Sequence, residues 1–226
     1  MVSIEGNIQE LLGKLPPEVK VVAVTKTRTA EEAVHAYRAG LRIFGENRVQ
    51  ELAEKKRLLP EDIRWHLIGH LQTNKVRQAV ADATVIESVD SLRLLGKIDS
   101  EALKQEREID CLLQFHIATE ETKSGFAPGE AESIDWRSVA ASLSAVRICG
   151  VMGMATFTDD KRKVRKEFRT LALTFKRLQE KYFHDRAYFR EISMGMTGDW
   201  QVAVEEGSTM IRVGTLIFGE RIKKIK

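Results

Sequence analysis

The sequence feature that most constrains the fold is a regular alternation of short apolar runs with longer stretches of helical pattern. The short runs are rich in β-branched residues, and several are apolar on both faces. This is typical of parallel strands that are buried on both sides. Because a helical stretch follows almost every run, the alternation predicts a parallel sheet with helices packed around it.

The apolar runs number eight, at 19–24, 41–44, 63–68, 84–87, 110–117, 146–152, 187–192 and 209–213. Helical patterns occupy 3–13, 29–39, 47–58, 73–80, 90–105, 133–143, 158–182 and 197–206. Eight strands and eight helices, with the first helix ahead of the first strand, predict an α/β fold. The predicted architecture is a single (β/α)8 TIM barrel with an additional N-terminal helix, in one domain over residues 1–226. The alternative is an open doubly wound sheet, which normally has fewer strands at this length.

The helix boundaries carry their own signals. Thr29, Asp90 and Thr158 each precede a helical stretch, where a side-chain oxygen can accept from unpaired backbone N–H groups. Gly40 follows the helix predicted over 29–39, at a position where a left-handed residue commonly ends a helix.

Composition excludes several classes of protein. Hydrophobic residues make up 43% of the 226 and charged residues 31%, as in an ordinary globular protein. No apolar stretch is long enough to span a bilayer, and the first ten residues lack the features of a secretory signal. We therefore expect a cytoplasmic protein without a membrane partner.

Charge and cysteine content argue against nucleic acid and metal. The net charge is only +3, and the basic run at 221–226 is expected to be a solvated tail. Cys111 and Cys149 lie within apolar runs, which predicts buried thiols. Because no histidines accompany them at ligand spacing, we expect no metal site.

A barrel carries its functional groups on the loops that follow its strands. Polar or glycine-rich stretches follow most of the predicted strands, at 25–27, 45–48, 69–75, 120–125, 153–156, 193–199 and 214–215. We expect these stretches to converge on one mouth of the barrel.

Lys26 is the first candidate functional residue. It follows the first apolar run closely, so its amine begins in a partly desolvated place. Desolvation disfavours the ammonium and makes the amine available as a nucleophile toward an aldehyde. The alternative is a lysine whose head simply reaches solvent at the end of a strand.

Two glycine-containing loops strengthen the assignment of Lys26. The stretch 193–199 follows the seventh strand and 212–215 closes the eighth, where barrels often bind phosphate. In a closed barrel the eighth strand lies beside the first, which places these loops next to Lys26. The combination predicts a ligand with a phosphate and a carbonyl group, whereas glycines that merely permit turns are the alternative.

Seven segments, in this order, carry a resemblance: AVTKT (23–27), FGENRVQE (44–51), WHLIGHLQTNK (65–75), ETKSGF (121–126), GVMGMATFTDD (150–160), SMGMTGDW (193–200) and STMIRVGTLIFGER (208–221). Together they resemble the pyridoxal phosphate homeostasis protein family. These are single-domain, fold-type III proteins, similar to the N-terminal barrel of alanine racemase, that bind pyridoxal 5'-phosphate (PLP). The family's fold, a lone barrel preceded by a helix, agrees with the strand count.

The resemblance implies PLP as the cofactor and a role for each matching residue. Lys26 matches the lysine that forms a Schiff base with the cofactor. Ser193, Gly214 and Thr215 match positions that hold its phosphate, and Arg212 matches the arginine that reaches the pyridine nitrogen.

Two further residues match motif positions near the ring and the mouth, namely Asn47 and His70. The seven predicted cofactor-binding residues are thus Lys26, Asn47, His70, Ser193, Arg212, Gly214 and Thr215. No purely catalytic residue is predicted.

Arg212 has a chemical consequence. A guanidinium only donates hydrogen bonds and stays charged, so beside the ring nitrogen it opposes protonation there. An unprotonated ring is a poorer electron sink, and this weakens PLP chemistry. The resemblance also implies that racemases use a second domain after the barrel, whereas only 216–226 follow Thr215 here.

We therefore expect a monomeric protein that holds PLP, buffers or delivers it within the cell, and catalyses little or nothing. Apo forms of PLP-dependent enzymes are the expected acceptors. One alternative is a PLP-dependent amino-acid racemase that uses His70 or a carboxylate at the mouth as its second base. Another is an aldolase-like enzyme whose Lys26 forms a Schiff base with a phosphorylated sugar.

Overall fold

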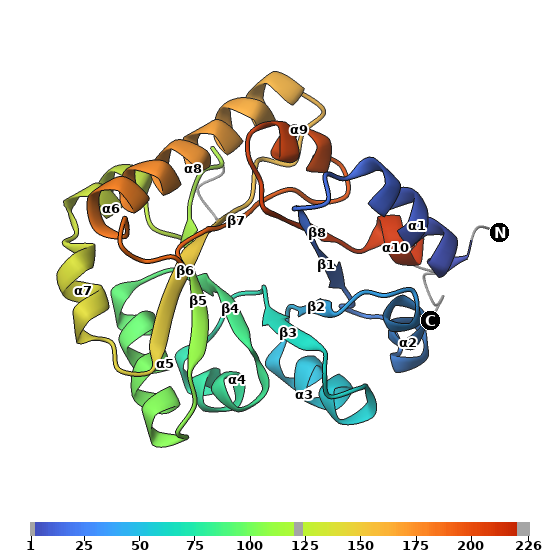
Figure 1. Ribbon diagram of the computed structural model, residues 1–226, viewed down its shortest axis with the longest axis horizontal. Helices are drawn as coiled ribbons and strands as arrows, with labels where there is room; N and C mark the ends of the chain where they lie inside the picture. The colour runs from blue at the N-terminus through green and yellow to red at the C-terminus, as the bar shows by residue number, and fades with distance from the viewer. Residues whose placement is uncertain (1–2, 120–123, 221–226) are drawn as a thin grey trace.

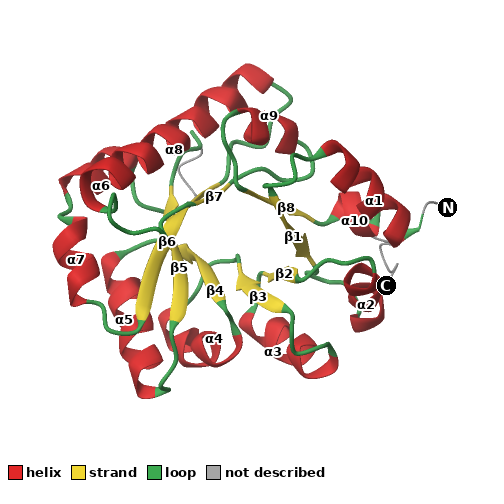
Figure 2. Cartoon of the chain, in the orientation of Figure 1, coloured by secondary structure: helices red, strands yellow, loops and turns green. Residues whose placement is uncertain are grey.

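Eight parallel strands form a closed barrel in the computed structural model, which describes residues 3–119 and 124–220. The strands follow one another around the barrel in chain order, and β8 pairs with β1 to close it. Helices surround the barrel on its outside (Figure 1, Figure 2). The predicted (β/α)8 barrel with an extra N-terminal helix is confirmed, and the open sheet is not formed.

The strands are β1 Lys20–Val24, β2 Ile43–Glu46, β3 Arg64–Leu67, β4 Val85–Val89, β5 Ile109–Phe115, β6 Val146–Gly153, β7 Glu191–Ser193 and β8 Met210–Val213. The helices are α1 Ile4–Lys14, α2 Ala30–Arg38, α3 Val49–Leu58, η1 Thr73–Lys75, α4 Val76–Asp82, α5 Leu92–Lys104, α6 Pro128–Ser133, α7 Trp136–Ser142, α8 Lys161–Tyr182, α9 Trp200–Glu205 and α10 Thr215–Phe218. The short helices α6 and α10 were not predicted. The polar stretch at 120–123 and the basic run at 221–226 lie outside the described residues.

The extra helix α1 joins the beginning of the chain to its end. It lies beside α10 (Figure 1), and the Nδ2 of Asn7 donates a hydrogen bond of 2.9 Å to the carbonyl oxygen of Ile217. The buried Ile8 and Leu11 provide its apolar face. Helix α1 therefore braces the region where β8 meets β1.

Two of the three predicted helix caps were wrong by one or two residues. Ser91 caps α5 in place of Asp90, and Asp160 caps α8 in place of Thr158. In both cases the residue that caps the helix lies closer along the chain to the first helical turn than the predicted residue does. Gly40 has the left-handed φ of +99° that was expected after α2.

The cap of α2 is confirmed and is reciprocal. The Thr29 hydroxyl accepts from the N–H of Glu32 at 3.2 Å, and the Glu32 carboxylate accepts from the N–H of Thr29 at 2.8 Å. Two backbone donors that the helix leaves unpaired are satisfied in this way. This capping box also fixes the end of the loop that carries Lys26.

Replacing Thr29 by alanine should lower the free energy of unfolding by about 1 kcal/mol, because one half of this capping box is lost. For a chain of this size the melting temperature should fall by roughly 2–4 °C. Thermal unfolding followed by circular dichroism measures the change. Thr29→Ser keeps the oxygen and should melt within about 1 °C of the wild type, and an unchanged melting temperature in Thr29→Ala would contradict the cap's role.

The apolar core lies mainly between the sheet and the helices, where Phe44, Trp65 and Phe168 are fully buried. A second, smaller apolar cluster fills part of the barrel interior, made of Val85, Leu112, Cys149 and Met152. The predicted burial of both cysteines is confirmed, since Cys111 and Cys149 are free, buried thiols. Burial raises the pKa of the Cys111 thiol well above its usual value.

Among residues 3–119 and 124–220, no helix has the length and apolar character needed to cross a membrane. Over the same ranges there is no group of three or more His, Cys, Asp or Glu side chains arranged to hold a metal ion.

Candidate functional site at the C-terminal mouth of the barrel

A cavity of about 660 Å³ opens at the end of the barrel where the strands finish. Its lining comes from β1 and β8 and from the loops that follow β1, β2, β3, β6, β7 and β8: Val24, Lys26, Arg28, Asn47, Ile68, Met154, Ala155, Thr156, Phe157, Thr158, Asp159, Met196, Thr197, Gly198, Asp199, Arg212, Gly214 and Thr215. Most of the predicted convergence of loops is therefore confirmed. The volume lies within the range of about 300–1,000 Å³ that is usual for small-molecule sites.

Lys26 lies in a tight turn directly after β1 and is half-buried. The next residue, Thr27, has a φ of +64°, which is rare for a β-branched residue. Its N–H donates to the Glu51 carboxylate at 3.3 Å, and the N–H of Arg28 donates to the carbonyl of Thr25 at 2.9 Å. Such strained backbone persists only where its surroundings hold it, and it is often found at functional sites.

The residue before Lys26 is held by a buried ion pair. The Lys55 ammonium donates to the carbonyl oxygen of Thr25 at 2.5 Å and to the carboxylate of Glu46. The Thr25 hydroxyl donates to the same carboxylate at 2.6 Å. Burial raises the pKa of Glu46, and the contacts with Lys55 and Thr25 offset only part of this rise. The backbone on both sides of Lys26 is thus held in place.

Arg212 lies on β8 and contributes to the lining of the cavity from the barrel interior, where only 4% of the residue is exposed. Its guanidinium donates to the carbonyl and hydroxyl oxygens of Ser193 at 2.7 and 2.6 Å, and to the carbonyl of Gly153 at 2.9 Å. Burial lowers the pKa of Arg212, whereas Glu87 and Asp199 act to raise it. Since arginine ordinarily titrates above about 12, the group stays charged at neutral pH.

A chain of polar contacts continues from Arg212 into the barrel. The Ser193 hydroxyl donates to one oxygen of Glu87 at 2.6 Å, and the other oxygen lies 2.6 Å from the Nδ1 of His66. Burial acts to raise the pKa of Glu87, but His66, Arg212 and Ser193 together outweigh it and lower the pKa. Glu87 therefore remains a carboxylate and balances the charge of Arg212. We refer to Arg212, Ser193, Glu87 and His66 as the axial chain.

Two glycines in the loops that follow β7 and β8 allow the backbone to pack closely near the cavity. Gly195 has a φ of +96°, and a Cβ there would lie 2.6 Å from the Cβ of Ala203. At Gly214 a Cβ would lie 3.0 Å from the carbonyl oxygen of Val24, so the missing side chain allows β8 to pass close to β1. A side chain at either position would collide with packed neighbours, so glycine allows the close packing of the backbone there.

The loop after β6 forms the opposite side of the mouth. Thr156 is anchored to α8, because the Glu167 carboxylate accepts from its N–H at 2.7 Å and from its hydroxyl at 2.8 Å. The next residue, Phe157, is 97% exposed. The phenyl ring of Phe157 thus lies at the entrance of the cavity, on a loop that is anchored to α8.

The structure brings five of the seven predicted site residues together, and they line one cavity: Lys26, Asn47, Arg212, Gly214 and Thr215. Ser193 is fully buried and lies outside the lining, where it contacts Arg212. His70 also lies outside the lining. Its side chain is 60% exposed, and its Nδ1 lies 3.4 Å from the carboxylate of Asp90.

Sequence reasoning missed several lining residues, including Arg28, Thr156 and Asp159. Arg28 lies two residues after Lys26 in the same loop, and its guanidinium pairs with Glu32 at 3.1 Å. Because Arg28 is so close to Lys26 in the sequence, it could have been predicted as a lining residue. Thr156 and Asp159 belong to the segment 150–160 but were not singled out within it.

Comparison with known proteins agrees with this geometry. The family model for the alanine racemase N-terminal domain matches residues 2–222. The pyridoxal phosphate homeostasis protein of Synechocystis is 37% identical over 94% of this chain and 96% of its own length. The protein of the same name from Aquifex aeolicus is 36% identical over 89% and 87%.

Solved structures give the same result. PipY of Synechococcus elongatus, solved with PLP bound, is 36% identical, with a TM-score of 0.86 over 96% of this chain and all of that one. Alanine racemase of Clostridium difficile has a TM-score of 0.81 at 14% identity over 98% of this chain and 58% of that one, which shows a shared fold alone. The chain belongs to the alanine racemase N-terminal domain family and, within it, to the pyridoxal phosphate homeostasis proteins.

Proposed function

We propose that this chain binds PLP reversibly as a Schiff base on Lys26, and that it buffers and delivers the cofactor in the cytoplasm with little or no catalysis of its own. The observation that carries the proposal is the position of Lys26. Its half-buried amine shares a cavity with a buried arginine and with the glycine-lined backbone of β8. The cofactor contributes an aldehyde for the amine, a phosphate and a ring that accepts electrons.

The residues present fit such a ligand. Gly214 and Thr215 lie beside the Lys26 loop, and their backbone can approach a phosphate closely. Ser193, predicted to hold the phosphate, is buried outside the lining and instead holds Arg212 in place through two hydrogen bonds. Asn47 lies in the lining, where its amide can reach the ligand. A role for His70 stays a prediction.

The axial chain is a reason to expect little catalysis. Arg212 is held by Ser193 and Gly153, and Glu87 keeps it charged, so it presents a fixed donor to the interior end of the cavity. A donor there disfavours a proton on a ring nitrogen, and this limits the stabilisation of a carbanion. Relatives named for PLP homeostasis rather than for a reaction support the same view.

The test is an absorbance spectrum of the purified, PLP-treated protein before and after borohydride reduction, followed by peptide mapping. We expect a visible band that reduction removes, and a pyridoxyl group on the peptide that contains Lys26. A colourless protein would instead favour the aldolase-like alternative. A pyridoxyl group located on other lysines alone would contradict the proposal.

A racemase is the second candidate, because the carboxylates of Asp159 and Asp199 line the same cavity as Lys26. Exchange of the α-proton for deuterium across a panel of amino acids separates the two functions. We expect exchange far slower than on the order of 1 per second, which is the low end of typical enzyme turnover. Faster exchange would favour the racemase.

Delivery and assembly need separate measurements. We expect a monomer by light scattering. When the PLP-loaded protein is mixed with an apo PLP-dependent enzyme, that enzyme should become active faster than release of free PLP allows. If a PLP-trapping reagent abolishes the activation, the protein buffers the cofactor but does not hand it over directly.

A further inference from the structure

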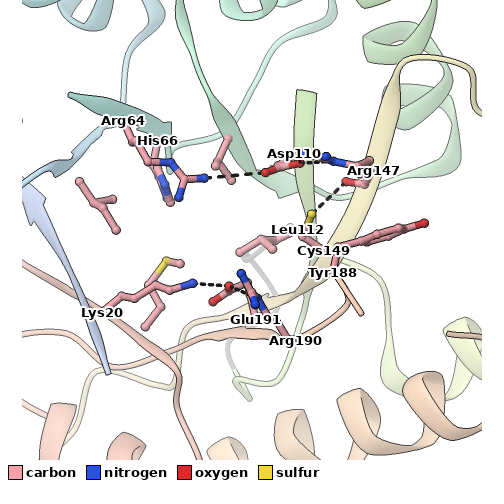
Figure 3. Close-up of a pocket in the computed structure, with 13 residues that line it drawn as sticks. Lys20, Arg64, His66, Asp110, Leu112, Arg147, Cys149, Tyr188, Arg190 and Glu191 are labelled. Carbon is pink, nitrogen blue, oxygen red and sulfur yellow. Dashed lines mark hydrogen bonds and ion pairs between the residues drawn. The ribbon is translucent and has the colours of Figure 1, made fainter. Parts of the chain in front are cut away.

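A second cavity, of about 270 Å³, lies at the opposite end of the barrel, where the strands begin. Figure 3 shows the charged side chains around it. Several are the first residues of their strands, such as Lys20 of β1, Arg64 of β3 and Glu191 of β7. The proposed function makes no use of this cavity.

One wall holds a cluster of two cations around one carboxylate. The ammonium of Lys20 pairs with Glu191, and the Nε of Arg190 lies 3.5 Å from the same carboxylate oxygen. Glu191 is 11% exposed, whereas Arg190 is 72% exposed. This Glu191 cluster has two positive charges and one negative charge, so it has an excess of one positive charge.

The other wall repeats this arrangement. The Nη2 of Arg147 lies 2.7 Å from the carboxylate of Asp110, and the Nη2 of Arg64 lies 3.8 Å from it. A further carboxylate, Glu108, lies 3.7 Å from Arg147, but it is 73% exposed and lies outside the lining. Among the lining residues, the Asp110 cluster therefore has two cations and one carboxylate, and Glu108 pairs with Arg147 from outside the lining.

The two clusters face each other across an apolar strip. In Figure 3 the Glu191 cluster and the Asp110 cluster lie on opposite sides of the cavity, and Leu112 lies between them. Ile43, Val85 and Met210 add further apolar lining. Burial raises the pKa of the Cys149 thiol to about 12, so this lining residue contributes no negative charge at neutral pH.

His66 provides a further polar group. It is a lining residue of this cavity, and its Nδ1 is bound to Glu87. Its Nε2 is buried and has no hydrogen-bond partner among the described residues. Because the Nδ1 of His66 donates to the Glu87 carboxylate, the Nε2 is an acceptor. A buried acceptor without a partner is costly, and a water molecule that bridges it to an occupant of the cavity can satisfy it.

We propose that this cavity binds a small dianion whose two anionic groups are joined by a short apolar span, namely a short-chain dicarboxylate. Each cluster takes one carboxylate, and the apolar strip contacts the carbon chain. The volume falls just below the range of about 300–1,000 Å³ for drug-sized ligands, which limits the occupant to a small molecule. Ion pairs that served only to close this end of the barrel would not need four cations in the lining for its two carboxylates.

Isothermal titration of succinate into the protein, at low ionic strength and with saturating PLP, tests the proposal. PLP, which the proposed function places at the other mouth, keeps succinate out of that mouth. We expect one succinate per chain, and acetate should bind at least about tenfold more weakly because it engages only one cluster. Arg64→Gln and Arg190→Gln should each weaken succinate binding on the order of tenfold, since each removes a charge-assisted hydrogen bond.

Arg93→Gln is the matched control, because Arg93 is exposed on α5 and lies outside the cavity lining. It should bind succinate as the wild type does. Arg64 and Arg190 are half or more exposed, so their variants should fold, and circular dichroism checks this. The proposal is wrong if succinate at millimolar concentration gives no binding heat or if acetate binds equally well. It is also wrong if the variant that combines Arg64→Gln with Arg190→Gln binds succinate like the wild type.

Discussion

Replacing Lys26 by alanine should abolish the visible absorbance of the PLP-treated protein and its reducible covalent adduct. Arginine cannot take the place of this lysine, since a guanidinium stays protonated and is no nucleophile. Lys26→Arg should therefore lose the adduct as well, although it keeps the positive charge. Mass spectrometry after borohydride reduction measures the stoichiometry, which should fall from about one per chain to near zero in both variants.

Lys161→Ala is the control for this experiment, because Lys161 is an exposed lysine at the start of α8, on the side of the barrel where β6 ends. It should keep the full adduct. If Lys26→Ala keeps a covalent adduct at the wild-type stoichiometry, another amine holds the cofactor and the proposed function loses its central residue.

Arg212→Met should destabilise the protein by about 3–5 kcal/mol, because it leaves the Glu87 carboxylate in the barrel without its cation. At the size of this chain the melting temperature should fall by roughly 6–20 °C. Adding Glu87→Gln should recover part of the loss, since the unpaired charge is then removed. Thermal unfolding of the wild type, the two single variants and the double variant forms the cycle that measures this coupling.

The axial chain also predicts the pH dependence of stability. The folded pKa of Glu87 lies below its ordinary value of 4.5, so its contribution is present above that pH and is lost as the pH falls through the folded pKa. Removing Arg212 raises the folded pKa, so the variant should gain less stability than the wild type between acid and neutral pH. Equal pH profiles for the two proteins would show that Arg212 does not act on Glu87.

The alternation of runs was enough to predict the barrel, but it misplaced the start of β7. The predicted strand began at 187, whereas β7 begins at Glu191. Phe189 is apolar because it stacks on Phe183 and Phe175, with ring centroids 4.2 and 5.0 Å apart. An apolar residue that packs against a helix cannot be told from a strand residue by hydropathy alone.

The site was predictable where a residue directly follows a strand, as Lys26, Asn47 and Gly214 do. It was not predictable in the barrel interior. Whether Glu87 and His66 face inward depends on the register and tilt of the strands, which only the closed barrel defines. The ion pair of Lys55 with Glu46 likewise depends on how α3 packs against β2.

The closure of β8 onto β1 has a consequence for how the molecule acquires its site. Lys26 and Gly214 stand near opposite ends of the chain, and they meet only when the last strand pairs with the first. No nascent chain that lacks β8 can therefore form the complete cavity. Bringing together segments so far apart carries a large loop-closure entropy, which is typical of slow folding. A ligand that bridges the two strands would then slow unfolding, and cofactor binding during refolding would report the moment at which the barrel closes.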